Sequence, residues 1–118
     1  MAGEWIDKAW GRTRALHCNG SLEIIECEIV KGGFSSLHRH AAKSNEFMVV
    51  SGRLLLHIDD IPGGRVRELT PSTGCYRVAA GIGHQFKALE PTVLIEFYHG
   101  VKPSPLDIER FTEGGAEA

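Results

Sequence analysis

The amino-acid sequence predicts an all-β protein, built as a barrel or sandwich of short antiparallel strands. Turn signals rich in glycine, proline and asparagine recur at short intervals from Asn19 to Pro91. Between them, apolar and polar residues alternate with the period of two that is typical of a strand with one buried face. The length of 118 residues predicts one domain, residues 1–118, with a single hydrophobic core.

Three runs show this alternation most clearly, and each predicts a strand. In the first and third runs the apolar set is distinct, whereas the run from Arg53 to Asp59 has a mixed second face. Because alternate side chains of a strand share a face, we expect each apolar set to face the core. In chain order these sets are Ile25, Cys27 and Ile29; Leu54, Leu56 and Ile58; and Val93, Ile95 and Phe97.

Only the C-terminal region predicts a helix. Ser104 is a favourable N-cap, Pro105 suits the first helical position and Asp107 falls in the first turn. A short helix is therefore expected from Pro105 to Phe111. Residues 112–118 contain two adjacent glycines and no apolar residue beyond alanine, and we expect them to fray.

The bulk composition excludes several classes of partner. A formal net charge of -2 provides no basic field for nucleic acid or for a membrane surface. No apolar run approaches the ~20 residues of a membrane-spanning helix, and the N-terminus lacks the basic and apolar regions of a signal peptide. Cys18, Cys27 and Cys75 are few and widely spaced, which predicts reduced thiols and a cytoplasmic location.

Three histidines form the most informative pattern of the chain. His38 and His40 lie two residues apart in a segment of strand character, so both imidazoles point to one face and can converge on one ion. His84 follows a turn, Gly81 to Gly83, and also leads into a short strand. Neutral imidazoles suit a divalent transition metal such as Zn, Fe, Mn or Ni, and three protein ligands leave one coordination position open. The histidines without such context are His17, His57 and His99, of which His57 and His99 are expected at strand edges or in solvent.

The fourth ligand position has two candidates. Counting back from the turn at Gly52 favours Asn45, whose amide oxygen binds metals only weakly. A β-bulge after the paired histidines would instead turn Glu46 inward, because a shift of one residue exchanges the two faces of a strand. We favour Asn45 inward, with Glu46 on the outer face near Lys43 or Arg53.

These residues resemble the two motifs of the cupin superfamily, whose members are small jelly-roll β-barrels. The first motif spaces a glycine, a His-x-His pair, a glutamate and a second glycine, and the sequence from Gly32 to Gly52 fits each spacing with Asn45 in the glutamate position. The second motif, Pro-x-Gly-x-x-His, is matched by residues 79–84 with alanine in place of proline. The resemblance implies a jelly-roll β-barrel and a metal bound by His38, His40, His84 and Asn45.

A closer resemblance extends along the chain to the type II mannose-6-phosphate isomerase domain. It rests on Lys8 to Gly11, Val49 to Gly52 and residues 106–111. In this alignment, His40 and His84 fall on metal-binding histidines of the family. The resemblance implies a metal-dependent isomerase that acts on a sugar or a sugar phosphate.

Four functions are compatible with these residues. The protein is expected either to act on a small molecule, such as a sugar phosphate, or to bind one without turnover. A three-histidine iron dioxygenase and a structural dimer module stapled by the metal are the further alternatives. A phosphate would need a cation at the mouth of the barrel, for which Arg39, Lys43 and Arg77 are available. Because the three imidazoles are neutral, they leave the full charge of the ion in the site, which favours an anionic or carbonyl-bearing ligand.

Self-association is also expected, because small β-barrels expose sheet edges that need covering. The N-terminal residues Trp5, Ile6 and Trp10 are apolar enough to pack against a second copy, and an isologous homodimer is the commonest arrangement. The expected partners are therefore a small molecule and a second copy of the chain, with no nucleic acid and no membrane.

Overall fold

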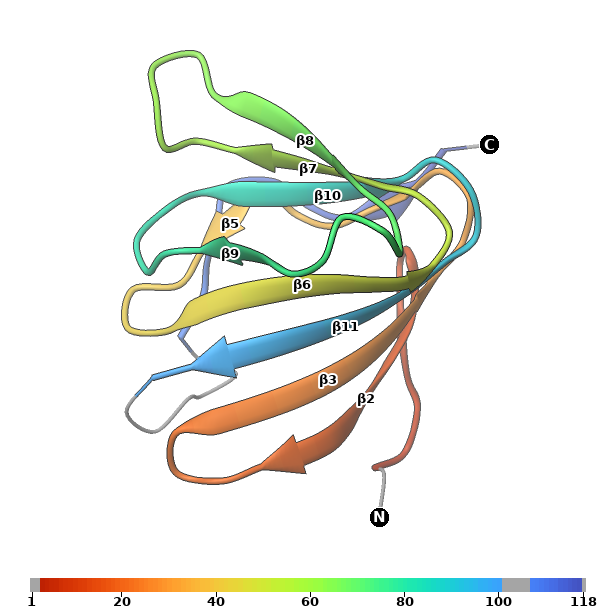
Figure 1. The fold of residues 1–118 in the computed structure, drawn as a ribbon, viewed down its shortest axis with the longest axis horizontal. Helices are drawn as coiled ribbons and strands as arrows, with labels where there is room; N and C mark the ends of the chain where they lie inside the picture. The colour runs from red at the N-terminus through yellow and green to blue at the C-terminus, as the bar shows by residue number, and fades with distance from the viewer. Residues whose placement is uncertain (1–2, 101–106, 118) are drawn as a thin grey trace.

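The structure, a computed structural model, describes residues 3–100 and 107–117, which contain thirteen strands and no helix. The strands form two antiparallel sheets that face each other across the core (Figure 1). No helix in the described ranges is long and apolar enough to cross a bilayer. The six-stranded sheet consists, in spatial order, of β1 (Ile6–Lys8), β2 (Gly11–Cys18), β3 (Leu22–Ile29), β11 (Thr92–His99), β6 (Ser44–Ser51) and β9 (Tyr76–Val78).

The seven-stranded sheet is centred on β10 (His84–Ala88). On one side of β10 lie β7 (Leu54–Ile58) and then β8 (Arg65–Leu69). On the other side, two short strands follow one another along β10, namely β4 (Gly33–Phe34) and β5 (His38–Arg39). The outer edge beyond them is formed by β13 (Gly115–Ala116) and β12 (Glu109–Arg110).

The two sheets do not close into the barrel that the sequence predicted. Among the described residues, β1 and β9 end the six-stranded sheet and β8 ends the seven-stranded sheet, and none of the three pairs with the facing sheet. Barrel closure requires an unbroken hydrogen-bonded ladder between the first and last strands at a fixed stagger. The architecture is therefore a sandwich of two sheets, which the alternation of side chains does not distinguish from a barrel.

Strand β11 turns the opposite face to the core from the one that the sequence predicted. The buried residues are Thr92, Leu94, Glu96 and Tyr98, and those expected inside, Val93, Ile95 and Phe97, are half-buried on the outer face. β11 is paired on both sides, with Leu94 opposite Cys27 of β3 and opposite Val49 of β6. Because both faces of this strand carry apolar residues, its register with two buried neighbours decides which face lies inside.

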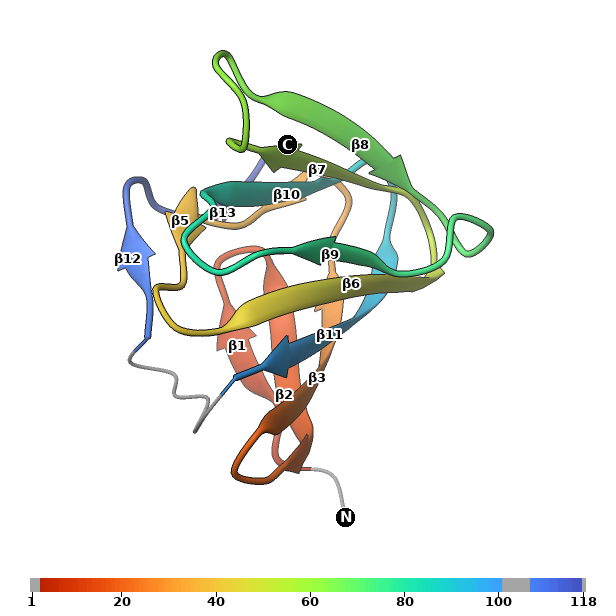
Figure 2. The ribbon, with the colours of Figure 1, turned by 60° about the vertical axis from the view of Figure 1, so that its left-hand side comes forward.

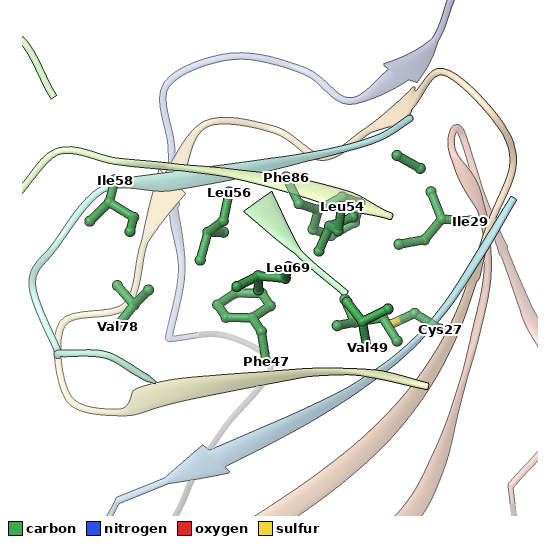
Figure 3. Close-up of a cluster of buried hydrophobic side chains, with 12 residues drawn as sticks. Cys27, Ile29, Phe47, Val49, Leu54, Leu56, Ile58, Leu69, Val78 and Phe86 are labelled. Carbon is green, nitrogen blue, oxygen red and sulfur yellow. The ribbon is translucent and has the colours of Figure 1, made fainter. Parts of the chain in front are cut away.

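Twelve apolar residues form the core between the sheets (Figure 3). β7 contributes Leu54, Leu56 and Ile58, as their alternation predicted. Phe47 and Val49 of β6 point across the gap toward the opposite sheet (Figure 3). Leu54 and Leu56 are fully buried, and burying such a side chain stabilises the fold by about 1.5–3 kcal/mol. The other members are Cys27, Ile29, Leu69, Val78, Phe86, Ala88 and Leu94.

The expected C-terminal helix is not present in the described part of its segment; Ser104 and Pro105 lie outside the described residues. Glu109–Arg110 instead forms β12, which pairs with β5 at the sheet edge (Figure 2). The Phe111 amide extends this pairing by donating to the Leu37 carbonyl at 2.8 Å. A helix of two turns is marginal in isolation, whereas the edge of β5 offers backbone groups that a strand can satisfy.

Residues 112–118 were expected to fray, but residues 112–117 run beside β4 and the segment that follows it; Ala118 lies outside the described residues. Gly115–Ala116 forms β13, and the Glu117 amide donates to the Gly32 carbonyl at 3.0 Å. Gly32 has a φ of 80°, and a Cβ atom there would lie 2.5 Å from the Glu117 carbonyl oxygen. The absence of a side chain at Gly32 therefore permits this close approach. Lys87 and Glu117 add an ion pair of 2.6 Å.

Candidate metal centre

Three buried histidines meet where β5 pairs with β10. His38 lies directly opposite His84 in the ladder, and His40 follows two residues after His38. One potential ligand atom from each residue lies within 4.8 Å of the other two. The exposed fractions are 9% for His38, 4% for His40 and 2% for His84. The structure thus brings together the histidines that the spacing predicted would converge.

The hydrogen bonds of the three rings identify Nε2 as the free nitrogen of each. Every Nδ1 lies within hydrogen-bonding distance of a backbone carbonyl oxygen, which can only accept, so Nδ1 carries the proton. The buried Nε2 atoms of His40 and His84 have no partner. A metal ion would satisfy such lone pairs. The Nδ1 groups and their carbonyl acceptors are His38 with Ser36 (2.8 Å), His40 with Asp107 (2.7 Å) and His84 with Ile82 (3.0 Å).

Burial keeps the three imidazoles neutral. It lowers the pKa of His38 to about 3, with further lowering from His84 and His40. Burial also lowers the pKa of His84 to about 4, against the opposing effect of its bond to the Ile82 carbonyl. The pKa of His40 is lowered by burial too, although its bond to the Asp107 carbonyl acts in the other direction. Neutral imidazole is the form that binds a metal, so no proton has to leave near neutral pH.

Asn45 points inward and Glu46 outward at the start of β6. The Asn45 side chain is 1% exposed, and neither its oxygen nor its nitrogen makes a hydrogen bond of normal geometry. Its partner on β11 is Tyr98, whose ring centroid lies 5.3 Å from that of His40. A Glu46 carboxylate oxygen lies 3.2 Å from the His99 Nε2 atom on the outer face. Of the two candidates for the fourth ligand position, Asn45 is therefore the one inside the sandwich.

The turn before His84 is tied directly to the first pair of histidines. The Gly81 amide donates to the His40 carbonyl at 2.7 Å, so the two motifs contact each other through the backbone. Gly81 has a φ of 84°, in the left-handed region that other residues rarely adopt. This bond fixes the loop before β10 relative to the loop after β5.

A cavity of ≈ 410 Å³ adjoins the histidines. His38 and His40 form part of its wall. Trp10, which the sequence analysis found apolar enough to pack against a second copy, lines the cavity and meets Phe86 edge to face, with 5.1 Å between ring centroids. The charged residues of the lining are Lys8, Lys43, Arg110, Glu23, Glu96 and Glu113.

Sequence reasoning missed two polar residues beside the histidines, Glu96 and Tyr98. The Tyr98 hydroxyl donates to a Glu96 carboxylate oxygen at 2.8 Å. Burial raises the pKa of Glu96, while the Tyr98 hydroxyl, the Lys43 charge and the nearby Asn45 amide lower it. The Lys43 Nζ atom lies 4.1 Å from the centroid of the Tyr98 ring. The available signal was an acidic residue within an apolar strand, and the wrong choice of face for β11 concealed it.

The other candidates lie away from the cavity or on its margin. His57 contacts Asp59 and His99 contacts Glu46, which agrees with their expected positions at strand edges or in solvent, and His17 contacts Asn19. Of the three cations considered for a phosphate, only Lys43 lines the cavity. Arg39 forms an ion pair of 2.8 Å with Glu109, and Arg77 is exposed on β9. All three cysteines are free.

Comparison with known proteins defines the fold. No protein-family model and no curated protein matches the chain. Oxalate decarboxylase from Bacillus subtilis at pH 4.6 matches with a TM-score of 0.82 and 15% identity, covering 92% of this chain and 30% of that one. A variant of that enzyme in which phenylalanine replaces a tryptophan matches with a TM-score of 0.81 and 14% identity over the same shares of the two chains. A structure of the same enzyme from work on its Mn(II) centres matches with a TM-score of 0.79 and 12% identity, again over 92% and 30%.

The protein therefore has a cupin fold, with a three-histidine site that suits a divalent transition metal. The chain spans 30% of the length of the oxalate decarboxylase chains, and at these identities the likeness concerns the fold. The fit to a metal rests on this protein's own atoms, namely buried Nε2 atoms without partners and rings held through Nδ1. The likeness to mannose-6-phosphate isomerases rests on sequence motifs.

Proposed function

We propose that this protein binds one divalent transition metal ion through the Nε2 atoms of His38, His40 and His84 and holds a small molecule against it. The observation that carries the proposal is the cluster of neutral, oriented imidazoles, two of which have buried Nε2 atoms without a partner. When bound, such an ion supplies Lewis-acid chemistry at its open position. The adjoining cavity of ≈ 410 Å³ falls within the range of small-molecule sites.

Asn45 is proposed as a weak fourth ligand, or as a hydrogen-bonding partner of whatever occupies the open position. Its buried amide offers one acceptor oxygen and two N–H donors, neither group being otherwise engaged in a regular hydrogen bond. Because the amide is neutral, the ion would keep its full charge. A carboxylate in this position would have removed part of that charge.

An anionic or carbonyl-bearing small molecule suits this site best. Among the described residues, those lining the cavity include as many cationic as acidic side chains, so they leave the charge of a bound ion uncompensated. An anion in the open position would neutralise part of it. A sugar phosphate, suggested by the sequence resemblance, and a carboxylate such as the oxalate of the structural neighbours' name both meet this requirement.

Turnover is supported by Glu96, because a carboxyl group in the cavity could move a proton to or from a bound molecule. A non-catalytic binding module would use the same ion and cavity without proton transfer. The iron dioxygenase is favoured by a ligand set that contains three histidines and no carboxylate. It requires iron in the purified protein and consumption of O2, whereas the isomerase would work with a redox-inert metal.

Elemental analysis of protein purified without chelator tests the metal assignment. About one metal ion per chain is expected in the wild type, and less than about a tenth of that in His40→Ala and His84→Ala. His57→Ala is the matched control, because His57 lies on β7 with its ring against the exposed Asp59. Full metal content in His40→Ala would refute the ligand assignment.

A homodimer is proposed as the assembly. Ile6 is 59% exposed on the edge strand β1, and Val50 is 51% exposed on β6 beside the half-buried outer face of β11. Trp10 does not support this proposal, because it lines the cavity. Sedimentation at micromolar concentration is expected to show twice the mass of the chain, and a stable monomer would contradict the proposal.

A further inference from the structure

The C-terminal segment from residue 107 onward lies against the strand that carries His38. In the pairing of β12 with β5, Arg110 lies opposite His38 and Glu109 opposite Arg39. Figure 2 shows β12 beside β5 at the edge of the sheet. Beyond this pairing, the Leu37 amide donates a hydrogen bond of 2.8 Å to the Thr112 hydroxyl oxygen.

Asp107 begins this segment and makes three hydrogen bonds to the loop at His40. Its carbonyl oxygen accepts from the His40 Nδ1 at 2.7 Å. Its carboxylate oxygens accept separately from the Ala41 amide at 2.8 Å and from the Ala42 amide at 3.0 Å. The carboxylate thus binds the peptide that follows His40, while the backbone of the same residue holds the ring.

His40 differs from the other two histidines in where its partner comes from. His38 and His84 each bond to a carbonyl two residues earlier in the chain. The partner of His40 is 67 residues away in sequence. The orientations of His38 and His84 are therefore set locally, whereas that of His40 is set only when the C-terminal segment docks.

We propose that Asp107 is a positioning residue for the metal centre. The Asp107 carboxylate anchors the C-terminal segment, and the Asp107 carbonyl thereby fixes the tautomer and orientation of the His40 ring. The inference rests on the proposed function, because His40 must be a ligand for metal affinity to respond. The Asp107 side chain acts through the Ala41 and Ala42 amides and does not itself bond to the ring. Outer partners of ligating histidines typically change metal affinity by about 10–100-fold.

Cobalt(II) titration of the full chain, followed by proton NMR, tests this role. The wild type is expected to show three exchangeable, paramagnetically shifted imidazole N–H signals, one from each ligand. Asp107→Ala removes both amide acceptors and frees the carbonyl to move. One of the three signals should then broaden or vanish through faster exchange with water, and the cobalt affinity should fall by about 10-fold or more. The signals of His38 and His84 should remain.

Two further variants separate anchoring from charge. Asp107→Asn removes the charge and keeps an acceptor oxygen for one amide, so its affinity should lie between those of the wild type and Asp107→Ala. Glu109→Gln removes the neighbouring charge and weakens the exposed ion pair with Arg39 without touching a histidine. This control should keep all three N–H signals and an affinity within about twofold of the wild type, as is usual for an exposed ion pair.

Several outcomes would overturn the positioning role. One is an Asp107→Ala variant with three unaltered N–H signals and unchanged affinity. Another is an equal loss of affinity in Asp107→Asn, Asp107→Ala and Glu109→Gln, which would indicate a plain effect of charge. Thermal unfolding of the metal-free variants identifies any that do not fold, and the N–H signals of Asp107→Asn then decide. A wild type that does not bind cobalt would refute the proposed function instead.

Discussion

The interior between the sheets has an apolar half and a polar half, and the same strands build both. β6 places Asn45 at its start and Val49 further along, both buried. β11 runs antiparallel to it, with Tyr98 opposite Asn45 and Leu94 opposite Val49. β10 begins with His84 and continues into the apolar core. Each strand therefore has polar residues at one end of its inward face and apolar residues further along. The polar ends of the three strands lie together, although β11 runs in the opposite direction to β6.

The two halves differ in how well their groups are satisfied. The apolar half consists of packed side chains of low exposure, which stabilise the fold. In the part of the chain that the structure describes, the polar half contains four buried side-chain atoms without a regular hydrogen bond, on His40, His84 and Asn45. An unsatisfied buried polar atom costs about 1–3 kcal/mol. One half of the interior therefore maintains the fold, while the other contains buried polar atoms that a bound metal ion would satisfy.

Removing a ligand from the polar half should have the largest effect on metal binding. His40→Ala is expected to abolish the stabilisation that added metal gives the wild type, which amounts to about 2.7 kcal/mol when the metal concentration is 100 times its Kd. The metal-free variant should stay folded, because it loses only one hydrogen bond, from the His40 Nδ1 to the Asp107 carbonyl, and the packing of one imidazole ring against Tyr98. Thermal unfolding with and without excess zinc or manganese measures both effects. If metal stabilised this variant as much as the wild type, His40 would not be a ligand.

Removing a side chain from the apolar half should lower the stability of the fold and leave metal affinity unchanged. Leu56→Ala is expected to lower the free energy of unfolding by about 2–5 kcal/mol, because Leu56 is fully buried in the core. Metal affinity of the folded variant should be unchanged, since Leu56 does not line the cavity. Val66→Ala is the control, with 55% exposure on β8 and an expected change within about 0.5 kcal/mol. Urea denaturation of the metal-free proteins measures the difference.

Acid should weaken the polar half selectively. The folded-state pKa values of His38 and His84 are about 3 and about 4, below the ordinary value of 6.5, so the unfolded chain binds more protons in between. The contribution of these two histidines to the free energy of unfolding is therefore complete above pH 6.5, and it is lost as the pH falls toward 4 and then 3. The slope is at most about 1.4 kcal/mol per pH unit for each histidine. Urea titrations of the metal-free protein at pH 7, 5.5 and 4.5 check this, and a flat profile would contradict neutral buried imidazoles.

The smallest effect is expected at the fourth ligand position. Asn45→Ala should weaken metal affinity only a few-fold, because an amide is a poor ligand, and Asn45→Glu should tighten it by adding a charged oxygen ligand. Glu46→Gln should leave metal affinity unchanged, since Glu46 pairs with His99 on the outer face. Competition with a chromophoric chelator measures all three variants. Weaker binding in Glu46→Gln than in Asn45→Ala would show that the wrong residue was assigned.

Predictions from the sequence were accurate where a feature depends on residues close together in the chain, and they were wrong where it depends on pairing between distant strands. The alternation of Leu54, Leu56 and Ile58 identified a strand and its buried face, because the other face, although mixed, carries His57 and only one apolar residue, Leu55. On β11 both faces carry apolar residues, and the prediction chose the wrong one. The C-terminal capping residues predicted a helix, but pairing with β5 outweighed that local preference. The barrel was likewise expected from strand content, which does not reveal whether the edges meet.

By itself, the sequence determined most of the strand content and placed His38 and His40 on one face, because the period of two and the turns are local properties of the chain. That His84 joins them depended on the pairing of β5 with β10. Only the tertiary structure decided which face of β11 lies inside, and with it the placement of Glu96 and Tyr98 in the cavity. It also decided that Asp107, 67 residues away in sequence, holds the ring of His40. Such contacts depend on which strands become neighbours and in what register, and that is settled by packing across the whole interior.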